Sequence, residues 1–416
     1  MSNFVDVDLG ASGTRFTSNC GKIGLPSNRM AFVDLNKAID IEPYDTTLEN
    51  SLEVIIEKQG ELIVDGQPIL PAKVLVGPMA ERYTSLIEKP SILRPKHSQR
   101  VNYISAILAC AMARVQHDVG EDIELYIAIP PVEVKSSKEV FINSLVGKYT
   151  VTFPKYQNGV TVNLNITEVK CFAEAYMAVV SYFFNMAGVV REEAKQFMTG
   201  TVLSLDIGAS TSDLAIIRDG RYLERTGRTI KTGGNVANAV LENLITEKYD
   251  CEMPSDVVER AMAEGRLPMG NTFVDVGDLV TEAKEFLAGQ IVTQLQNYFK
   301  TVEIPVQTIR GIIVSGGGSM QGQYVNESTG EVVKTSEPIS YFVTKNMQSV
   351  CSGVEAVPYG EDARLANIRG LYIRSRVDEV QKQRAPQPAP QPVVQAARQV
   401  TPQPAVQNPA TNTVAG

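Results

Sequence analysis

One short motif occurs twice in the sequence, and its residue types are suited to binding phosphate. The segments "DVDLGASGTRF" and "LSLDIGASTSDL" each place an aspartate, Asp8 or Asp206, two residues before a glycine, and small or hydroxylated residues follow. Glycine permits a tight turn, and the small residues leave backbone N–H groups unshielded, so such a turn can bind an oxyanion. The carboxylate would repel a phosphate unless Mg²⁺ and its water ligands lay between them. The repeated motif therefore predicts a site for a phosphate compound with Mg²⁺.

A third glycine-rich turn follows another apolar run. The segment "GIIVSGGGSM" covers 311–320 and places three glycines directly after a strand pattern. A glycine triplet lets the main chain approach a flat ligand closely. Any one of the three segments also fits an ordinary hairpin or a strand-to-helix turn, but their combination in this order favours a nucleotide site.

Two successive series of strands and helices along the chain, each called a pass, must position these turns. The alternation of apolar patterns in each pass, opened by the same hairpin, predicts a duplicated α/β domain. In the first pass we expect a hairpin at 3–9 and 14–18, buried strands at 73–77 and 124–130, and a helix at 101–115 with one apolar face. In the second pass we expect helices at 171–184, 233–249, 278–302 and 361–377, and strands at 201–208, 212–220 and 311–315.

Composition excludes several classes of protein. The 416 residues carry a net charge of −8, which argues against broad wrapping of nucleic acid. There is no run of 18 apolar residues and no signal-peptide pattern, and five dispersed cysteines without a C-x-x-C pair indicate reduced thiols in the cytoplasm. The only histidines are His97 and His117, so neither a zinc site nor a Ser-His-Asp catalyst is expected; His117 is predicted to lie on the surface.

The three motifs, taken together, resemble those of a known superfamily. Asp8–Arg15, Asp206–Asp213 and Ser315–Met320 resemble the phosphate 1, phosphate 2 and adenosine motifs of the actin, heat-shock chaperone and sugar kinase superfamily. "VKCFAEAYMAVVSYF" and "EDARLANIRGLYI" resemble its two connecting helices. "LVGPMAERY", "KTGGNVANAVLENL" and "DARLANIRGLYI" are similar to segments of the bacterial plasmid-segregating actins of the ParM type.

The resemblance covers the chain to about residue 380 and implies an α/β, actin-like fold. In such a fold, two ribonuclease-H-like domains surround a central nucleotide cleft. Domain I would comprise 1–167 with 361–384 returning to it, and domain II would comprise 168–360. The Pro/Gln/Ala-rich segment 385–416 is expected to be a disordered tail, because it cannot bury a core.

The resemblance also implies roles for single residues. Asp8 and Asp206 would hold hydrated Mg²⁺ from opposite sides of the cleft, and Glu174 would orient or deprotonate the attacking water; Glu168 lies near Glu174 in the sequence. Lys284 and Glu285 match the pair that flanks the purine in actins, although they also fit a solvated helix face. The residues implied in nucleotide binding are Gly10, Ala11, Ser12, Gly13, Thr14, Arg15, Gly208, Ala209, Ser210, Thr211, Gly233, Gly234, Asn235, Lys284, Glu285, Gly316, Gly317, Gly318 and Ser319.

The function that the resemblance implies is Mg²⁺-dependent hydrolysis of ATP, or of GTP, coupled to the turnover of a homopolymeric filament. The ParM-like segments imply segregation of plasmid DNA through a DNA-binding adaptor on a centromere-like site. Neither direct membrane binding nor strong direct DNA binding is expected. A cytoskeletal scaffold without a segregation role, a chaperone-like ATPase and a small-molecule kinase would use the same ATP site and stay open as alternatives.

Overall fold

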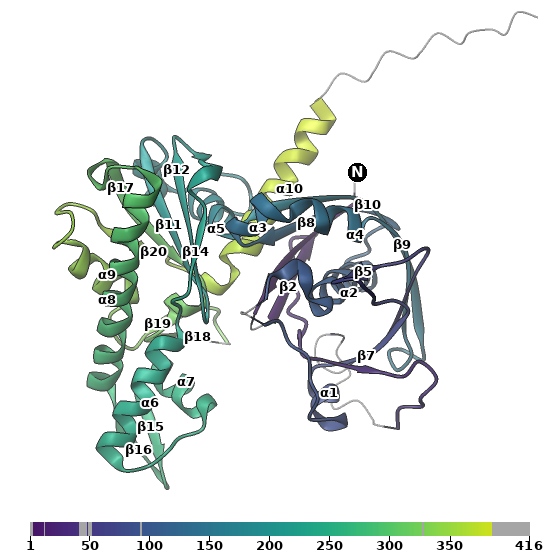
Figure 1. Ribbon diagram of the computed structural model, residues 1–416, viewed down its shortest axis with the longest axis horizontal. Helices are drawn as coiled ribbons and strands as arrows, with labels where there is room; N and C mark the ends of the chain where they lie inside the picture. Colours follow the sequence, from purple (N-terminus) through teal and green to yellow (C-terminus); the bar gives the residue numbers. More distant parts are fainter. Residues whose placement is uncertain are drawn as a thin grey trace, which may run out of the picture.

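Two α/β halves lie side by side, and helix α10 (Ala366–Arg384) runs between them (Figure 1). The computed structural model describes residues 3–11, 13–40, 48, 52–91, 94–326 and 328–384. Ser12 and the predicted tail at 385–416 fall outside the described residues. No helix within the described ranges is long and apolar enough to cross a membrane.

The first half is built on one mixed sheet, to which the described residues contribute eight strands. Its strands β1, β8 and β10 run parallel to one another, and the other neighbours pair antiparallel. In order across the sheet, the strands are β2 (Gly13–Ser18), β1 (Phe4–Gly10), β8 (Asp122–Ile129), β10 (Val160–Ala173), β9 (Gly147–Phe153), β4 (Leu52–Lys58), β7 (Ala72–Val76) and β3 (Met30–Val33).

The second half contains a smaller sheet with the same central arrangement. β11 and β12 form an antiparallel hairpin. β17 pairs parallel to β11, and β20 pairs parallel to β17. Across this sheet the order is β13 (Arg221–Tyr222), β12 (Ser212–Arg218), β11 (Thr201–Ile207), β17 (Ile309–Ser315) and β20 (Ala356–Pro358), with β14 (Arg228–Ile230) also paired to β12. Three further hairpins stand apart: β5–β6 (Ile63–Val64, Gln67–Pro68), β15–β16 (Arg266–Met269, Thr272–Asp275) and β18–β19 (Gln323–Val325, Val332–Lys334).

The two repeated motifs occupy equivalent positions in the two sheets. Asp8 lies opposite Arg15 in the β1–β2 hairpin, and Asp206 lies opposite Asp213 in the β11–β12 hairpin. In each case the hairpin borders a parallel strand, β8 in the first sheet and β17 in the second. The carboxyl ends of parallel strands meet at one edge of a sheet, so both motifs stand where ligands of α/β sheets bind.

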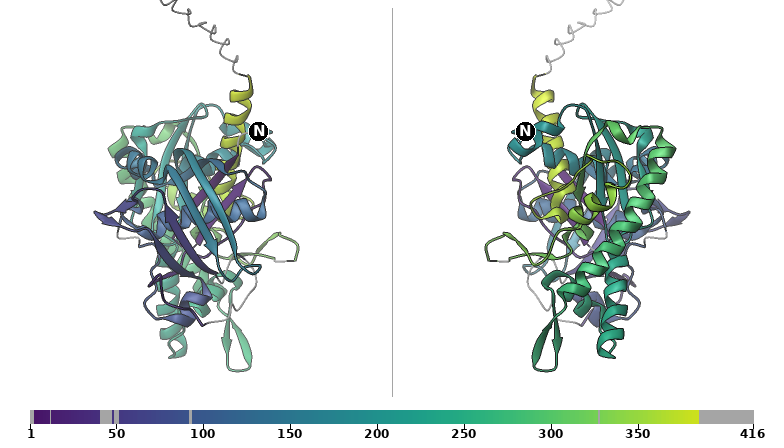
Figure 2. Two further views of the ribbon diagram at one scale, coloured as in Figure 1. Left: turned by 90° about the vertical axis from the view of Figure 1, so that its right-hand side faces the viewer. Right: turned by 90° about the vertical axis from the view of Figure 1, so that its left-hand side faces the viewer.

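Helices cover the sheets and join the halves. α5 (Glu174–Phe183) leads from β10 toward the second half and packs on α10. In the second half, α8 (Gly277–Val302) packs on both α6 (Asn235–Tyr249) and α9 (Ile339–Met347). The β15–β16 hairpin lies at the end of the molecule opposite the C-terminal end of α10 (Figure 2). The remaining α-helices are α1 (Pro78–Tyr83), α2 (Arg100–Gln116), α3 (Pro131–Ser136), α4 (Lys138–Leu145) and α7 (Ser255–Glu264).

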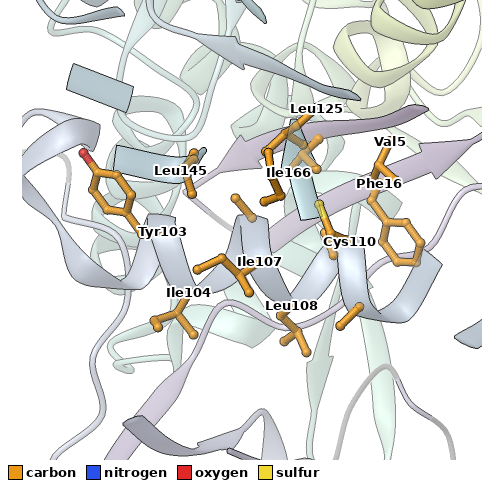
Figure 3. Packing of buried hydrophobic residues seen from close by; sticks show 14 of the residues in the cluster. Val5, Phe16, Tyr103, Ile104, Ile107, Leu108, Cys110, Leu125, Leu145 and Ile166 are labelled. Atoms are coloured by element: carbon orange, nitrogen blue, oxygen red, sulfur yellow. The ribbon is translucent and has the colours of Figure 1, made fainter. Parts of the chain in front are cut away.

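The alternation of side chains along β1 explains how one strand serves both a core and a site. Val5 and Val7 belong to the large core that contains α2, whereas Phe4 packs with Ile368 and Leu371 of α10. Successive side chains of a strand point to opposite faces, so Asp8 shares the face of Phe4. Figure 3 shows part of the large core around α2. The aspartate therefore lies on the face that α10 covers, near the junction of the halves.

Three details differ from the sequence-based expectations. Residues 101–113 of α2 are all buried, not only one face, because strands β4 and β7 join the same core. The strand β10 continues to Ala173, so the predicted domain boundary between 167 and 168 falls inside it, and the helix predicted from 171 begins at Glu174. His117 is only partly exposed: it contacts Ser18 Oγ through Nδ1 at 2.8 Å and packs against Phe16.

Candidate functional site

A cleft of about 720 Å³ lies between the two halves, and both sheets contribute to its walls. It is lined by the turn after β1, the turn after β11, the glycine turn after β17 and the first residue of α5. This volume is within the range of roughly 300–1,000 Å³ that small-molecule sites occupy. The three turns that the sequence singled out are thus brought together at one cavity.

Most of the sequence-predicted residues line this cleft. The structure places there Asp8, Gly10, Ala11, Arg15, Glu174, Asp206, Gly208, Ala209, Ser210, Thr211, Gly234, Asn235, Gly316, Gly317 and Gly318. Four others, Gly13, Thr14, Gly233 and Ser319, stand next to lining residues without lining the cleft themselves. Ser12 lies outside the described residues.

The turn after β1 is held by hydrogen bonds from a neighbouring side chain. Asn28 donates from Nδ2 to the carbonyl oxygens of Gly10 at 2.7 Å and Ala11 at 3.2 Å. Arg15 lies 3.4 Å from the Asp8 carboxylate, measured from a guanidinium nitrogen to Oδ2. A cation and a carboxylate therefore stand side by side at this turn.

The turn after β11 is hydrogen-bonded to the start of α6. The backbone N–H of Gly234 donates to the carbonyl of Gly208 at 2.9 Å, and that of Asn235 donates to Ala209 at 2.6 Å. A Cβ on Gly233 would lie 2.7 Å from the backbone nitrogens of Ser210 and Thr211, so this close approach requires glycine. The N-terminus of α6 lies beside the turn, and the partial positive charge of a helix N-terminus favours an anion there.

Asp206 is a buried carboxylate with two neutral donors. Ser315 Oγ donates to Oδ1 at 3.3 Å, and Asn367 Nδ2 donates to Oδ2 at 2.9 Å. Burial raises the pKa of Asp206 to about 7, and the nearby carboxylates Asp213 and Asp8 add to this rise, which the two hydrogen bonds oppose. The ionised form of Asp206 is therefore poorly compensated without an added cation.

The glycine turn after β17 presses against the same aspartate. Gly316 has a φ of 87°, in the left-handed region, and a Cβ at this position would lie 2.3 Å from Asp206 Oδ1. Behind it, Ser319 Oγ donates to the Gly316 carbonyl at 2.7 Å and closes the 3₁₀ turn Gly317–Met320. The absence of a side chain at 316 keeps this edge of the cleft open and close to Asp206.

Glu174 is the first residue of α5 and forms an ion pair with Lys96, and both residues line the cleft. Its burial raises the pKa of Glu174 well above the ordinary value, while the positive charge of Lys96 opposes that rise. Burial alone would lower the pKa of Lys96, but Glu174, Asp8 and Glu133 together raise it. The pair lies in a region of concentrated negative charge.

The sequence reasoning missed several cleft residues. Lys96, His97 and Glu133 line the cleft, as do Asp213 and Asn367. Asp213 was inside a quoted motif, and its position opposite Asp206 follows from the register of the β11–β12 hairpin, in which Ile207 pairs with Ser212. Asn367 was inside the quoted run "ARLANIRG". For Lys96 and His97 the sequence offers only two basic residues after a proline, without any periodic pattern.

Three residues weighed in the sequence analysis lie away from the cleft lining. Lys284 is buried and donates from Nζ to Ser336 Oγ at 2.6 Å and to the Glu337 carbonyl at 2.5 Å. Glu285 forms an ion pair with Lys345 at 2.7 Å. Glu168 lies 3.6 Å from the ammonium of Lys170, so its partners are outside the cleft. The structure therefore brings neither Lys284 nor Glu285 to the cleft lined by the turns after β1, β11 and β17.

The residues of the cleft fit a Mg²⁺ ion that is held partly through water and phosphate. Asp8 and Asp206 supply carboxylate oxygens, the ligand type that Mg²⁺ prefers, and Asp206 lacks compensation for its charge. Among the described residues, no group of three His, Cys, Asp or Glu side chains is placed to hold a metal ion alone. Mg²⁺ usually keeps several water ligands and binds through one or two carboxylates plus substrate phosphates, which matches this donor set.

Two halves with duplicated hairpins around one cleft define the actin-like fold, and the comparisons with known proteins agree. Residues 204–323 match the family model described as archaeal actin homologue MreB-like, C-terminal. No curated protein sequence matches the chain. The fold class predicted from the sequence, and the predicted resemblance to actin-like proteins, are confirmed.

Solved structures of actin-like proteins match nearly the whole chain. The actin-like protein Alp7A has 17% sequence identity and a TM-score of 0.65, over 92% of this chain and 98% of that one. The archaeal actin homologue Ta0583 has 18% identity and a TM-score of 0.62, over 90% and 99%. The Bacillus thuringiensis ParM with ATP has 16% identity and a TM-score of 0.62, over 91% and 99%. At these identities the likeness establishes the fold.

Proposed function

We propose that this chain binds ATP with Mg²⁺ in the cleft and hydrolyses it, and that the nucleotide controls self-assembly into filaments. The observation that carries the proposal is the equivalence of Asp8 and Asp206, which lie near the ends of matching strands in the two halves and line one cavity. Further support is that a ParM of the same fold was solved with ATP, AMPPNP and ADP. A ligand contacted from both halves favours the closed arrangement of those halves.

Each group in the cleft has a part in this proposal. Phosphoryl transfer to water depends on positioning and on neutralising charge. The turn after β1 would bind phosphate oxygens from one side with Arg15, and the turn at Gly208–Thr211 from the other. Glu174, whose raised pKa suits proton acceptance, would orient or deprotonate the attacking water. Mg²⁺ held through water by Asp8 and Asp206 would neutralise phosphate charge.

The nucleoside would lie toward the second half. Gly234 and Asn235 at the start of α6 and Gly316–Gly318 after β17 offer main-chain surfaces without bulky side chains. Such surfaces suit the ribose and a purine ring. They do not discriminate adenine from guanine by themselves, so GTP stays open as an alternative substrate and must be assayed beside ATP.

The filament would act in the cytoplasm, and its role would be DNA segregation. The ParM-like segments of the sequence and the likeness to ParM folds support a filament that moves plasmid DNA through a DNA-binding adaptor on a centromere-like site. The net charge of −8 agrees with an adaptor rather than direct DNA binding. Because the γ-phosphate would be contacted from both halves, its loss on hydrolysis would loosen the cleft and destabilise the polymer.

Sedimentation and electron microscopy of the purified chain test this proposal. We expect filaments with ATP, more persistent filaments with AMPPNP, and monomers without nucleotide. The variant Asp206→Ala should lose hydrolysis, because one of the two metal-facing carboxylates is gone. Hydrolysis at the wild-type rate in Asp206→Ala, or no polymer with any nucleotide at any salt concentration, would contradict the proposal. A polymer that binds no centromere-like DNA with its operon partners would retain the ATPase filament but reject the segregation role.

A further inference from the structure

We propose that Lys96 is a further catalytic residue, which binds Glu174 in the nucleotide-free cleft and transfers to the γ-phosphate when ATP enters. This inference rests on the proposed ATP binding and deepens it. It gives Glu174 two states. Without a nucleoside triphosphate, Glu174 is paired with Lys96. When the γ-phosphate binds Lys96, the Glu174 carboxylate becomes available to the attacking water.

The first support is where the two charges lie. Lys96 opens the 3₁₀ turn Lys96–Ser98 directly before α2, and Glu174 opens α5, so the pair joins two elements of the first half at the cleft. Their side chains are only 16% and 10% exposed, yet both line the cavity. A charged pair that faces a cavity without filling it is accessible to a ligand that enters there.

The second support is the surplus of negative charge around the ammonium. Glu174, Asp8 and Glu133 all act on Lys96 electrostatically, and Asp8 and Asp213 act in the same way on Glu174. The carboxylates around the pair thus include one from each repeated hairpin, Asp8 and Asp213, together with Glu133 of α3. A triphosphate placed between those hairpins would carry more negative charge than Glu174. An ammonium on a flexible stem is suited to follow it as a point charge.

The third support is that hydrogen bonds hold the main chain of this turn in place. Glu133 accepts a hydrogen bond from the Lys96 backbone N–H at 2.8 Å, and Asn102 donates to the Lys96 carbonyl at 3.0 Å. Tyr103 donates to the carbonyl of His97 at 2.9 Å. The exchange of partners therefore needs only rotation about the side-chain bonds of Lys96, without movement of the turn.

The consequence is discrimination between ATP and ADP at one side chain. ADP has no γ-phosphate to draw Lys96 away, so Glu174 keeps its partner in the ADP state. ATP has to displace the Lys96–Glu174 contact, so removal of the Glu174 charge should make ATP binding easier as long as Lys96 is present. If the Lys96–Glu174 ion pair only held the turn against α5, it would not distinguish the two nucleotides.

A double-mutant cycle measured at equilibrium tests the inference. The affinities of AMPPNP and ADP are measured with Mg²⁺ by competition against a fluorescent nucleotide, in the wild type, Lys96→Met, Glu174→Gln and the double variant. We expect Lys96→Met to weaken AMPPNP binding by about 10- to 100-fold and ADP binding by less than about threefold. Glu174→Gln should tighten AMPPNP binding by about three- to tenfold in the wild type and leave it unchanged in Lys96→Met.

Two controls keep the outcome interpretable. Lys135→Met removes another lysine that joins the halves, since Lys135 Nζ donates to the Gly227 carbonyl at 3.2 Å, but Lys135 does not line the cleft. It should change both affinities equally, if at all. Lys96→Arg, which retains the charge should Lys96→Met fail to fold, should bind AMPPNP within about tenfold of the wild type.

The outcomes separate the inference from the function on which it rests. Equal weakening of AMPPNP and ADP by Lys96→Met, or the same effect of Glu174→Gln with and without Lys96, would overturn the role of Lys96. A wild-type chain that binds neither nucleotide would instead overturn the proposed function.

Discussion

Gly370 of α10 lies directly against the main chain of Met177 in α5. A Cβ at 370 would be 2.0 Å from the Met177 carbonyl oxygen, which belongs to a helix backbone and cannot rotate away. α5 leads out of the first sheet, and α10 returns to pack on β1 and β8 after the second sheet is complete. The two helices that connect the halves therefore touch backbone to backbone, and only glycine permits this contact.

Gly370→Ala should force these helices apart. We expect the free energy of unfolding in urea to fall by about 1–3 kcal/mol, the usual cost of overpacking a close contact. The matched control is Gly289→Ala on α8, where an added Cβ would meet no atom within 4 Å. It should raise the free energy of unfolding by about 0.5–1 kcal/mol, because alanine is the better helix residue. Equal small effects at both positions would show that the helices separate without cost.

Asp206→Asn should change how stability depends on pH. The pKa of Asp206 is about 7 in the folded chain, whereas an unfolded aspartate ionises near pH 4 (about 3.9). Between these values the folded state binds a proton that the unfolded state has released. Stability due to this group therefore falls as pH rises from about 4 to about 7. The amide is neutral throughout, so the variant should lack this pH dependence. Its free energy of unfolding at pH 8 should exceed that of the wild type by about 1–3 kcal/mol.

Denaturation of the nucleotide-free protein at pH 5 and pH 8 measures that difference. Asp6, Glu174 and Asp213 also have raised pKa values because of burial. The variant should therefore retain part of the wild-type slope of stability against pH. The same variant should bind Mg²⁺-nucleotide more weakly than the wild type. An unaltered slope would mean that Asp206 is ionised in the free cleft, with its charge compensated by other groups.

Glu174→Gln should separate hydrolysis from assembly. Loss of a general base commonly lowers a rate by about 10²- to 10⁴-fold, and the amide cannot accept the proton of water. We expect phosphate release to fall by that factor, while ATP still promotes filaments that now persist. Glu192→Gln serves as control, because the Glu192 side chain is 84% exposed and forms its ion pair with Lys195 outside the cleft. Hydrolysis within tenfold of the wild type would remove Glu174 from the mechanism.

Lys284→Met decides between the sequence-based and the structural role of Lys284. In the structure, Lys284 anchors the chain at Ser336 and Glu337, and burial lowers its pKa to about 8. We expect the free energy of unfolding to fall by about 1–3 kcal/mol, since buried acceptors lose their donor, and nucleotide affinity to stay within about threefold. A tenfold loss of affinity with undiminished stability would favour the predicted contact with the purine.

Much of the positioning was predictable because it follows from local patterns. Apolar runs and hairpin turns place Asp8 and Asp206 near the ends of their strands. The apolar run before Gly316 likewise places the glycine turn directly after a strand. The seven-residue distance between Asp206 and Asp213 makes them face each other once the two-strand pairing is known. A strand has a repeat of two residues, so register along a hairpin is a property of the sequence itself.

By itself, then, the sequence determined the duplicated hairpins, the actin-like fold and the two aspartates at the cleft. Tertiary structure alone decided which distant side chains meet them. Lys96 reaches Glu174 from a turn without any periodic pattern, and Asn367 reaches Asp206 from the last helix. Lys284, which the motif pointed toward a purine, is instead buried with Ser336. Local propensity sets the direction of a strand or helix, but contacts between elements depend on how whole layers pack, and that information is distributed over the chain.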